Sequence, residues 1–168
     1  MTTELYDVTV PALLHGFRSM ATILDKARAW ADEHGTPHAE LLEARLIDDM
    51  APLTAQVQRT SDAAKFAIAR LGQVEAPEMP DTETSFDELQ ARIAATVAFL
   101  KSIPREVIDG REDADVEVKT PSRSFHFKGL PYVTGFVLPN FYFHMTTAYA
   151  ILRAKGVPLG KMDYLGGF

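Results

Sequence analysis

Four segments of the chain carry apolar residues at the spacing of an amphipathic helix. Across residues 9–33, hydrophobic side chains recur every three or four positions from Val10 to Ala31, and Gly35 and Pro37 follow. This spacing places side chains on one face of a helix, and glycine and proline are typical of a helix end. The pattern predicts a first helix over 9–33. His15 faces away from its apolar stripe, so we expect it to be exposed.

The same period continues from about Pro37 or His38 to Leu71, which predicts a long second helix. Pro52 lies within it. Proline removes one backbone donor and crowds the preceding turn, so we expect a kink at Pro52 and not an end. Residues 73–84 combine two prolines with four acids and little apolar periodicity. They predict a linker across the end of a bundle.

Two further helices are predicted in the second half of the chain. Ser85 followed by Glu88 matches a capping box, and the apolar residues after it predict a third helix over 86–102. Residues 131–155 are apolar on most sides of a helix, which is typical of an element buried on more than one face. This fourth helix contains Pro139, where a second kink is expected.

Between the third and fourth helices the apolar period changes from about 3.6 to two. Val116 and Val118 alternate with charged residues, and Phe125 and Phe127 alternate with polar ones, across a turn-forming stretch at 120–123. Residues 114–128 therefore predict a β-hairpin whose apolar face packs on the bundle. The tail 157–168 is too apolar for a free end and is expected to dock. Residues 1–168 are thus interpreted as one domain.

Three strings of the chain carry a resemblance to a known family. They are ARLIDDMAPLTAQVQ at 44–58, SFDELQARIAATVAFL at 85–100 and LPNFYFHMTTAYAILRAKGVPLGKMDYLG at 138–166. They resemble an uncharacterised bacterial family, a domain of unknown function, within the DinB/YfiT-like four-helix-bundle metalloenzyme superfamily. The resemblance implies an all-α DinB-like bundle with a small hairpin before the last helix. It also implies a homodimer, which is common in that superfamily.

The resemblance further implies a metal site. Better-known relatives bind a divalent metal through one histidine on helix two and a pair four residues apart on helix four, and some activate thiols such as bacillithiol, mycothiol or glutathione. Here only His144 matches that pattern. Asn140 and Ala148 stand four residues before and after it, and helix two offers Asp48 and Asp49. We therefore expect no cofactor beyond a weakly held divalent metal.

The composition of the chain excludes several classes of binding partner and site. The net charge is −6, and the 17 lysines and arginines are scattered, which argues against nucleic acid. No run of apolar residues reaches the roughly 18 that a membrane span requires. The absence of cysteine excludes disulfides and thiolate metal sites. These features favour the cytoplasm, with a second copy of the chain and an unidentified small molecule as the expected partners.

The candidate site lies between helices two and four. Asp49 and His144 each stand beside an apolar stripe and are the candidate catalytic pair; the candidate pocket residues are Gln56, Thr60, Asn140 and Thr147. Asp49 could orient His144 as a general base, or both could hold a divalent ion with water. Alternatively, they form a buried hydrogen-bonded pair that fixes helix register. Metal-ligating protein residues are not predicted, because two ligands make too weak a site.

These alternatives leave three functions open, and whether the chain is an enzyme remains undecided by the sequence. The first is a DinB-like protein with a small-molecule pocket between helices two and four. The second is a non-catalytic homodimeric binding or structural protein. The third is a divalent-metal-dependent enzyme of the thiol-transferase kind. The arrangement of Asn140, His144 and Asp49 around a solvent-accessible cavity would favour the first.

Overall fold

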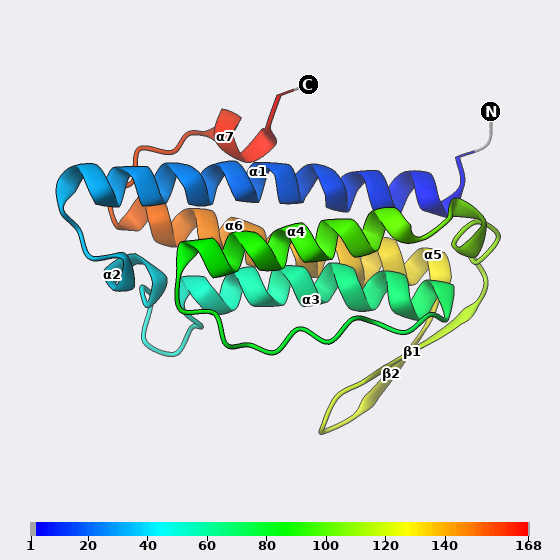
Figure 1. Ribbon diagram of the computed structural model, residues 1–168. Helices are drawn as coiled ribbons and strands as arrows, with labels where there is room; N and C mark the ends of the chain where they lie inside the picture. The colour runs from blue at the N-terminus through cyan, green and yellow to red at the C-terminus, as the bar shows by residue number, and fades with distance from the viewer. Residues whose placement is uncertain (1–2, 168) are drawn as a thin grey trace.

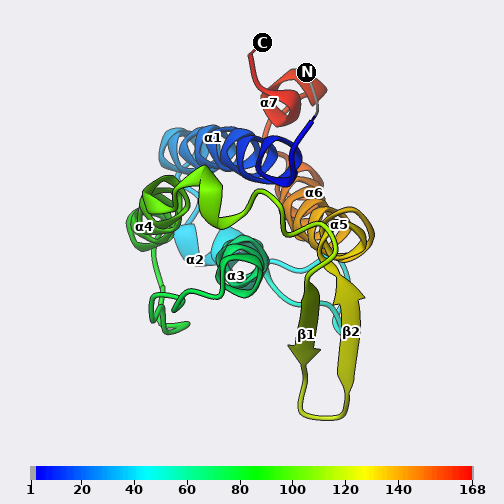
Figure 2. The ribbon, with the colours of Figure 1, turned by 90° about the vertical axis from the view of Figure 1, so that its right-hand side faces the viewer.

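Four long helices bury their apolar faces against one another in the computed structural model, which describes residues 3–167 (Figures 1 and 2). They are α1 (Leu5–His34), α3 (Leu53–Gly72), α4 (Phe86–Ser102) and α6 (Leu138–Ala154). Seen end-on, α1 lies diagonally opposite α3, with α4 and α6 on either side. Short helices and a hairpin complete the chain: α2 (His38–Leu42), a 3-10 turn (Arg105–Val107), β1 (Asp115–Lys119), β2 (Ser124–Lys128), α5 (Gly129–Tyr132), a π-helical turn (Val133–Val137) and α7 (Lys161–Leu165). The predicted bundle with a hairpin before the last long helix is confirmed.

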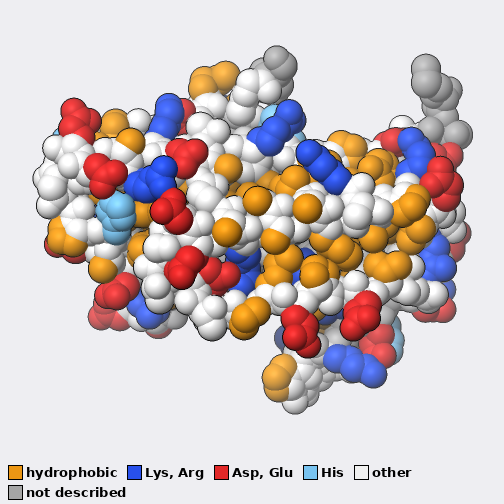
Figure 3. Space-filling model, in the orientation of Figure 1, with side chains coloured by type: hydrophobic (Ala, Val, Ile, Leu, Met, Phe, Trp, Pro, Cys, Tyr) orange, Lys and Arg blue, Asp and Glu red, His pale blue; other side chains and the backbone are white. Residues whose placement is uncertain are grey.

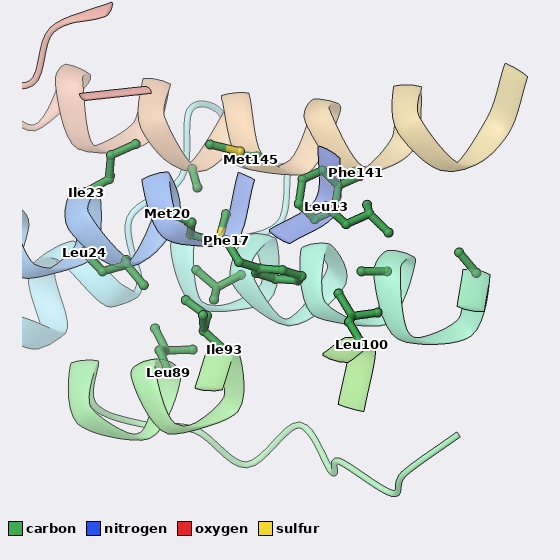
Figure 4. Packing of buried hydrophobic residues seen from close by; sticks show 14 of the residues in the cluster. Leu13, Phe17, Met20, Ile23, Leu24, Leu89, Ile93, Leu100, Phe141 and Met145 are labelled. Atoms are coloured by element: carbon green, nitrogen blue, oxygen red, sulfur yellow. The ribbon is translucent and has the colours of Figure 1, made fainter. Parts of the chain in front are cut away.

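Aromatic packing between α1 and α6 marks the centre of the core. Phe17 points from α1 between the other helices, and Phe141 and Met145 reach the core from α6 (Figure 4). The rings of Phe17 and Phe141 meet edge to face with centroids 5.2 Å apart, a favourable aromatic geometry. A Cβ at Gly16 would lie 2.4 Å from the ring of Phe141. Glycine at this position therefore permits the close approach of α1 and α6.

The expected continuous second helix is wrong. α2 ends at Leu42 and α3 begins at Leu53, and Pro52 is the extended residue that precedes α3 (φ −70°, ψ 170°). Proline has no N–H for a bond to the preceding turn and disfavours helical geometry at the residue before it. Leu46 belongs to the apolar period from which this helix was predicted, but it lies in the loop 43–52 and is 43% exposed.

Helix six follows α5 without interruption through the π-helical turn Val133–Val137. Pro139 is the second residue of α6, directly after this turn. A π-helical turn is a recognised way to accommodate a disturbed hydrogen-bond ladder and occurs often at functional sites. The predicted disturbance at Pro139 thus takes the form of a wider turn on its N-terminal side.

The Ser85 cap forms only half of the predicted box. The Ser85 hydroxyl accepts a hydrogen bond from the backbone N–H of Glu88 at 3.2 Å. The Glu88 carboxylate reaches back to the N–H of Thr84 at 2.6 Å instead of that of Ser85. Both bonds still satisfy N–H groups at the start of α4.

The hairpin pairs Asp115 with Lys128 and Lys119 with Ser124, in antiparallel register. Val116 and Val118 are buried against the bundle, and Phe125 and Phe127 are half-buried. The ribbon extends away from the bundle beside α3 and α5, on the side opposite α7 (Figure 2).

The chain after α6 returns along α1. Val157 and Leu159 are buried, and α7 packs on the outer side of α1 (Figure 1). On the face that Figure 3 shows, acidic and basic side chains are interspersed around the hairpin and the bundle ends, with apolar side chains between them. No helix within residues 3–167 is long and apolar enough to cross a membrane.

Candidate functional site

A hydrogen bond between α3 and α6 organises the candidate site. Nδ1 of His144 lies 2.8 Å from Oε1 of Gln56. The amide nitrogen of Gln56 donates to the carbonyl of Ala51 at 3.0 Å, where the loop 43–52 meets α3. That second bond fixes the orientation of the amide, so Oε1 accepts and Nδ1 of His144 donates.

This arrangement determines the state of the His144 ring. With the hydrogen on Nδ1, Nε2 carries a free lone pair and is the nitrogen available to a ligand. No hydrogen bond to Nε2 is formed by any of the described residues. Burial, helped by the nearby guanidinium of Arg59, lowers the pKa of His144 to about 4. The ring is therefore neutral at physiological pH.

His144 lines a cavity of about 250 Å³ that lies between α3, α6 and the hairpin. Apolar walls come from Ala63 and Phe66 of α3, Val118 of β1, and Phe136 and Val137 of the π-helical turn. Polar groups complete the lining: Arg59, Asp62, Arg70, Lys119, Thr120, Asn140 and His144. An apolar pocket with a few convergent polar groups is typical of a small-molecule site.

The cavity has an excess of positive charge. Asp62 is neutralised by Lys65 at 3.0 Å and by Arg92 at 2.9 Å. Arg59 is exposed and has no ion-pair partner within the described part of the chain. Arg70 donates to the hydroxyl of Tyr132 at 3.0 Å, and no carboxylate among the described residues is paired with it. Cationic groups that lack a carboxylate favour an anionic ligand.

Comparison with known proteins identifies the family. A family model, "Domain of unknown function (DUF1993)", matches residues 5–165. The chain belongs to the DUF1993 family. It is also similar to a solved structure, a DinB family member protein from Shewanella denitrificans, with 37% identity and a TM-score of 0.89 over 98% of this chain and 93% of that one. No curated protein matches the sequence significantly.

Three of the residues predicted for the site in this DUF1993 chain are brought together. Gln56 binds His144, and Asn140, one turn before His144, lines the same cavity. Thr60 is buried, but its hydroxyl donates to the carbonyl of Gln56 at 2.8 Å. Thr147 likewise donates to its own helix, to the carbonyl of Phe143 at 2.7 Å. These two hydroxyls are engaged by their own helices.

Asp49 lies elsewhere. It is exposed in the loop 43–52, because the helix that was expected to carry it ends at Leu42. The buried carboxylate–imidazole pair with His144 is not formed, and Gln56 occupies the position next to the ring. An amide there orients the imidazole without supplying a negative charge, which leaves the pKa of His144 low.

The sequence analysis did not identify Arg59 and Arg70 as cationic residues of the cavity. Arg59, Phe66 and Arg70 recur at intervals of seven and four residues, so they share one face of α3. The Phe66 ring is 37% exposed, and the guanidinium of Arg70 lies 5.3 Å from its centroid. The spacing of these three residues could have revealed this second face of α3 from the sequence. The contribution of Val118 and Lys119 to the cavity could not be predicted, because it depends on where the hairpin packs.

The donor set does not fit the three-histidine metal site of the superfamily. Nε2 of His144 is one good ligand, Asn140 is a weak one, and Ala148 has no donor at the third position. Within residues 3–167, no three His, Asp or Glu side chains are grouped so that they could hold a metal ion. The guanidinium of Arg59 also opposes a cation beside His144.

Proposed function

We propose that this DUF1993 protein binds a small anionic molecule in the cavity beside His144. The observation that carries the proposal is a neutral imidazole with a free Nε2 in a cavity lined by Arg59 and Arg70, neither of which is paired with a carboxylate in the described chain. The guanidinium groups supply charge and donors for a carboxylate or phosphate, and Nε2 supplies one acceptor.

The ligand therefore carries both an anionic group and a hydrogen-bond donor, such as a hydroxyl, amine or thiol. Thiols that bear carboxylates, such as the glutathione and bacillithiol that the superfamily resemblance suggests, have this combination of groups. The walls of Phe66, Phe136 and Val118 favour an apolar portion between the two polar ends.

Binding is favoured over general-base catalysis. A base works best when its pKa lies near the working pH, and a pKa of about 4 makes His144 a weak proton acceptor at neutral pH. The thiol-transferase alternative requires a metal that the donor set does not fit. A hydrogen bond from the ligand to Nε2 requires neither a raised pKa nor a metal.

Ligand-observed NMR tests the proposal with a panel of small carboxylates, phosphate monoesters and glutathione. We expect at least one class to bind, and Arg59→Gln to weaken its affinity by about tenfold, since one charged contact is worth on the order of 1.4 kcal/mol. His144→Asn should weaken binding as well. The control is Lys101→Gln, an exposed lysine on α4 that lies outside the cavity lining. Equal affinities of the Arg59 variant and the wild type would exclude this cavity.

A second candidate, a homodimeric protein, is supported by a different surface. Leu46 and Ile47 in the loop 43–52, together with Phe143 of α6, are large apolar side chains between 43% and 61% exposed. Next to them, a hollow of about 520 Å³ is lined by Leu46, Met50, Tyr142, Phe143, Thr146, Thr147 and Ala150. Contiguous exposed apolar surface of this kind is characteristic of interfaces. Both proposals can hold together, because the hollow and the cavity share no lining residue.

A further inference from the structure

A second cavity, of about 320 Å³, lies between α1 and the C-terminal segment that carries α7. Its lining comes from four residues of α1 (His15, Arg18, Ser19 and Thr22) and from Met162, Asp163, Gly166 and Gly167. α7 lies on the opposite side of the bundle from the hairpin (Figure 2), and this cavity shares no lining residue with the one beside His144. It is therefore independent of the proposed function.

Specific side-chain contacts hold the walls of this cavity. Lys26 forms an ion pair with Asp163, and Tyr164 is 2.8 Å from the hydroxyl of Thr146 on α6. His15, which the sequence indicated as exposed, is half-buried beneath the tail, and its Nε2 donates to the carbonyl of Leu165. Two contacts to α1 and one to α6 thus hold the tail in place.

Ser19 provides the first sign of a ligand. Its side chain is buried, with 2% of the residue exposed, and its hydroxyl has no hydrogen-bond partner among residues 3–167. Elsewhere on α1 the hydroxyls of Thr9 and Thr22 donate to the carbonyl four residues earlier. An unpaired buried hydroxyl costs on the order of 1–3 kcal/mol, so it calls for a partner that the described residues do not supply.

A glycine keeps the space next to the Ser19 hydroxyl open. Gly166 has φ +74°, and a Cβ there would lie 2.9 Å from Oγ of Ser19 and 3.3 Å from the His15 ring. A side chain at this position would be strained by its backbone and would press on both groups. Glycine leaves space directly above the hydroxyl.

Arg18 supplies a positive charge to the lining of the cavity. Its guanidinium donates to Nδ1 of His15 at 3.2 Å. Since Nε2 of His15 donates to the tail, Nδ1 carries no hydrogen and can only accept, so His15 positions Arg18. No carboxylate within residues 3–167 is ion-paired with Arg18. The one acid in the lining, Asp163, is neutralised by Lys26 and accepts from the N–H of Gly160 at 2.8 Å.

We propose that this cavity binds a small oxyanion, a carboxylate or phosphate group, through the guanidinium of Arg18 and the hydroxyl of Ser19. Both groups are donors, and each has bonding capacity that the described part of the chain does not use. An oxyanion accepts several hydrogen bonds at once and compensates the charge of Arg18. The volume accommodates either free phosphate or an oxyanion that is part of a small organic molecule.

The test is a titration of the isotope-labelled full chain with inorganic phosphate and, separately, with acetate, at constant ionic strength. Saturable shifts of the backbone resonances of residues 15–22 and 162–167 are expected with one or both anions. A response to acetate alone identifies a carboxylate ligand, and a response to phosphate alone identifies a phosphate. Absence of saturable shifts with both anions overturns the proposal.

Variants separate a binding role from a structural one. Arg18→Gln and Ser19→Ala should each weaken the affinity by about tenfold or more, which corresponds to roughly 1.4 kcal/mol. Ser19→Ala removes an unpaired hydroxyl, so the melting temperature without anion should be unchanged or higher. The matched control is Arg28→Gln on the same helix, whose guanidinium pairs with Asp87 outside the cavity. If the Ser19 and Arg18 variants bind as the wild type does, the assignment is wrong. These variants leave Arg59 and His144 intact, so the outcome is distinct from that of the proposed function.

Discussion

Gln56 and His144 join α3 to α6 through a hydrogen bond of 2.8 Å, and this bond decides which ring nitrogen is free. Because Gln56 also binds the carbonyl of Ala51, one side chain connects the loop before α3 with the middle of α6. A neutral amide orients the ring without raising its pKa, unlike the carboxylate that was expected there. The site consequently presents an acceptor beside cationic groups, an arrangement suited to binding an anion.

The first prediction concerns stability and pH. His144 has a folded-state pKa of about 4, lowered from the ordinary value of 6.5. Between these two values the unfolded chain binds a proton that the folded chain does not, so the free energy of unfolding rises with pH. The contribution of His144 is complete above pH 6.5 and is lost as the pH falls through 4.

Urea denaturation at about pH 7 and about pH 4.5 measures this effect. The wild type should lose roughly 2–3 kcal/mol more than His144→Asn over that interval, at 1.36 kcal/mol per pKa unit. Asn keeps a polar side chain of similar size but does not titrate, so the carboxylates contribute equally to both proteins. An identical loss in the two proteins would contradict the lowered pKa.

The second prediction concerns Arg92, whose side chain is 2% exposed and faces three acids. Its guanidinium lies 2.9 Å from Asp62 and 3.0 Å from both Asp81 and Glu83. It thereby holds the linker 73–84 against α3 and α4. Removing one member of a buried ionic cluster typically costs 3–5 kcal/mol. Because two of these acids remain solvated, we expect Arg92→Met to lower the free energy of unfolding by about 3 kcal/mol.

The same variant should release the linker. Limited proteolysis is expected to cut Arg92→Met within residues 76–83 faster than the wild type, because a freed segment without secondary structure is readily cleaved. Lys101→Met on the exposed face of α4 is the control and should change stability by less than about 0.5 kcal/mol. Unaltered proteolysis of the linker would show that Arg92 does not restrain it.

The third prediction compares two glycines. A Cβ at Gly129 would lie 1.9 Å from the carbonyl oxygen of Arg111, whereas one at Gly135 meets nothing within 4 Å. Gly129→Ala must displace backbone where the hairpin joins α5 and should cost about 1–3 kcal/mol or more. Gly135→Ala should stabilise by about 0.4–1 kcal/mol, since alanine restricts the unfolded chain. Thermal melts of both variants measure the difference, and a Gly129→Ala melting temperature at or above that of the wild type would refute it.

The apolar period predicted the long helices correctly, but it did not predict where each of them begins and ends. The first helix was predicted from residue 9 and begins at Leu5, and the third was predicted and found at 86–102. Before Pro52, the apolar period continues through Leu46 and Met50, although these residues lie in a loop and α3 begins only at Leu53. A stripe of apolar residues records which side chains could be buried. Whether a proline bends a helix or begins a new one depends on local backbone energies that the stripe does not contain.

The site was partly predictable for the same reason. Gln56, Asn140 and His144 stand beside apolar stripes, and this position was enough to bring them together in the correct helices. The predicted position of Asp49 assumed a helix through this residue, but the helix ends at Leu42. Nothing local in the sequence indicates that Val118 and Lys119 close the cavity, because that contact follows from the docking of the hairpin.

The fourth prediction is that the chain forms a homodimer through the apolar surface of Leu46, Ile47 and Phe143. These side chains are 43%, 61% and 57% exposed. Sedimentation equilibrium at micromolar concentration should give twice the chain mass of 18.6 kDa. Phe143→Glu places a charge in the proposed interface and should shift the equilibrium to the monomer. Met162→Glu, at a residue of α7 that is 62% exposed, is the matched control. A wild type that sediments as a monomer would exclude the dimer.

The final prediction concerns metal, which the superfamily implies. We expect the purified protein, produced without a histidine tag, to retain no stoichiometric zinc, nickel or iron after extensive dialysis. A dependable zinc site requires three or four protein ligands rich in nitrogen or sulfur. This chain has no cysteine, and the other four histidines have other places in the fold. His15 binds the tail, His34 binds the carbonyl of Trp30, His38 binds Asp32, and His126 lies on β2 opposite Glu117.

Two properties of His144 decide whether a cation could still bind there. Its low pKa removes competition from protons, which favours a metal, whereas Arg59 repels a cation and no carboxylate of residues 3–167 is hydrogen-bonded to the ring. Affinity for a divalent ion should therefore increase in Arg59→Glu, where the opposing charge is replaced by a ligand, and in Asn140→His, which restores a histidine pair four residues apart. Elemental analysis of the wild type, and calorimetric titration of both variants with zinc, make the comparison. Close to one metal ion per chain in the dialysed wild type would show that ligands beyond this donor set complete the site.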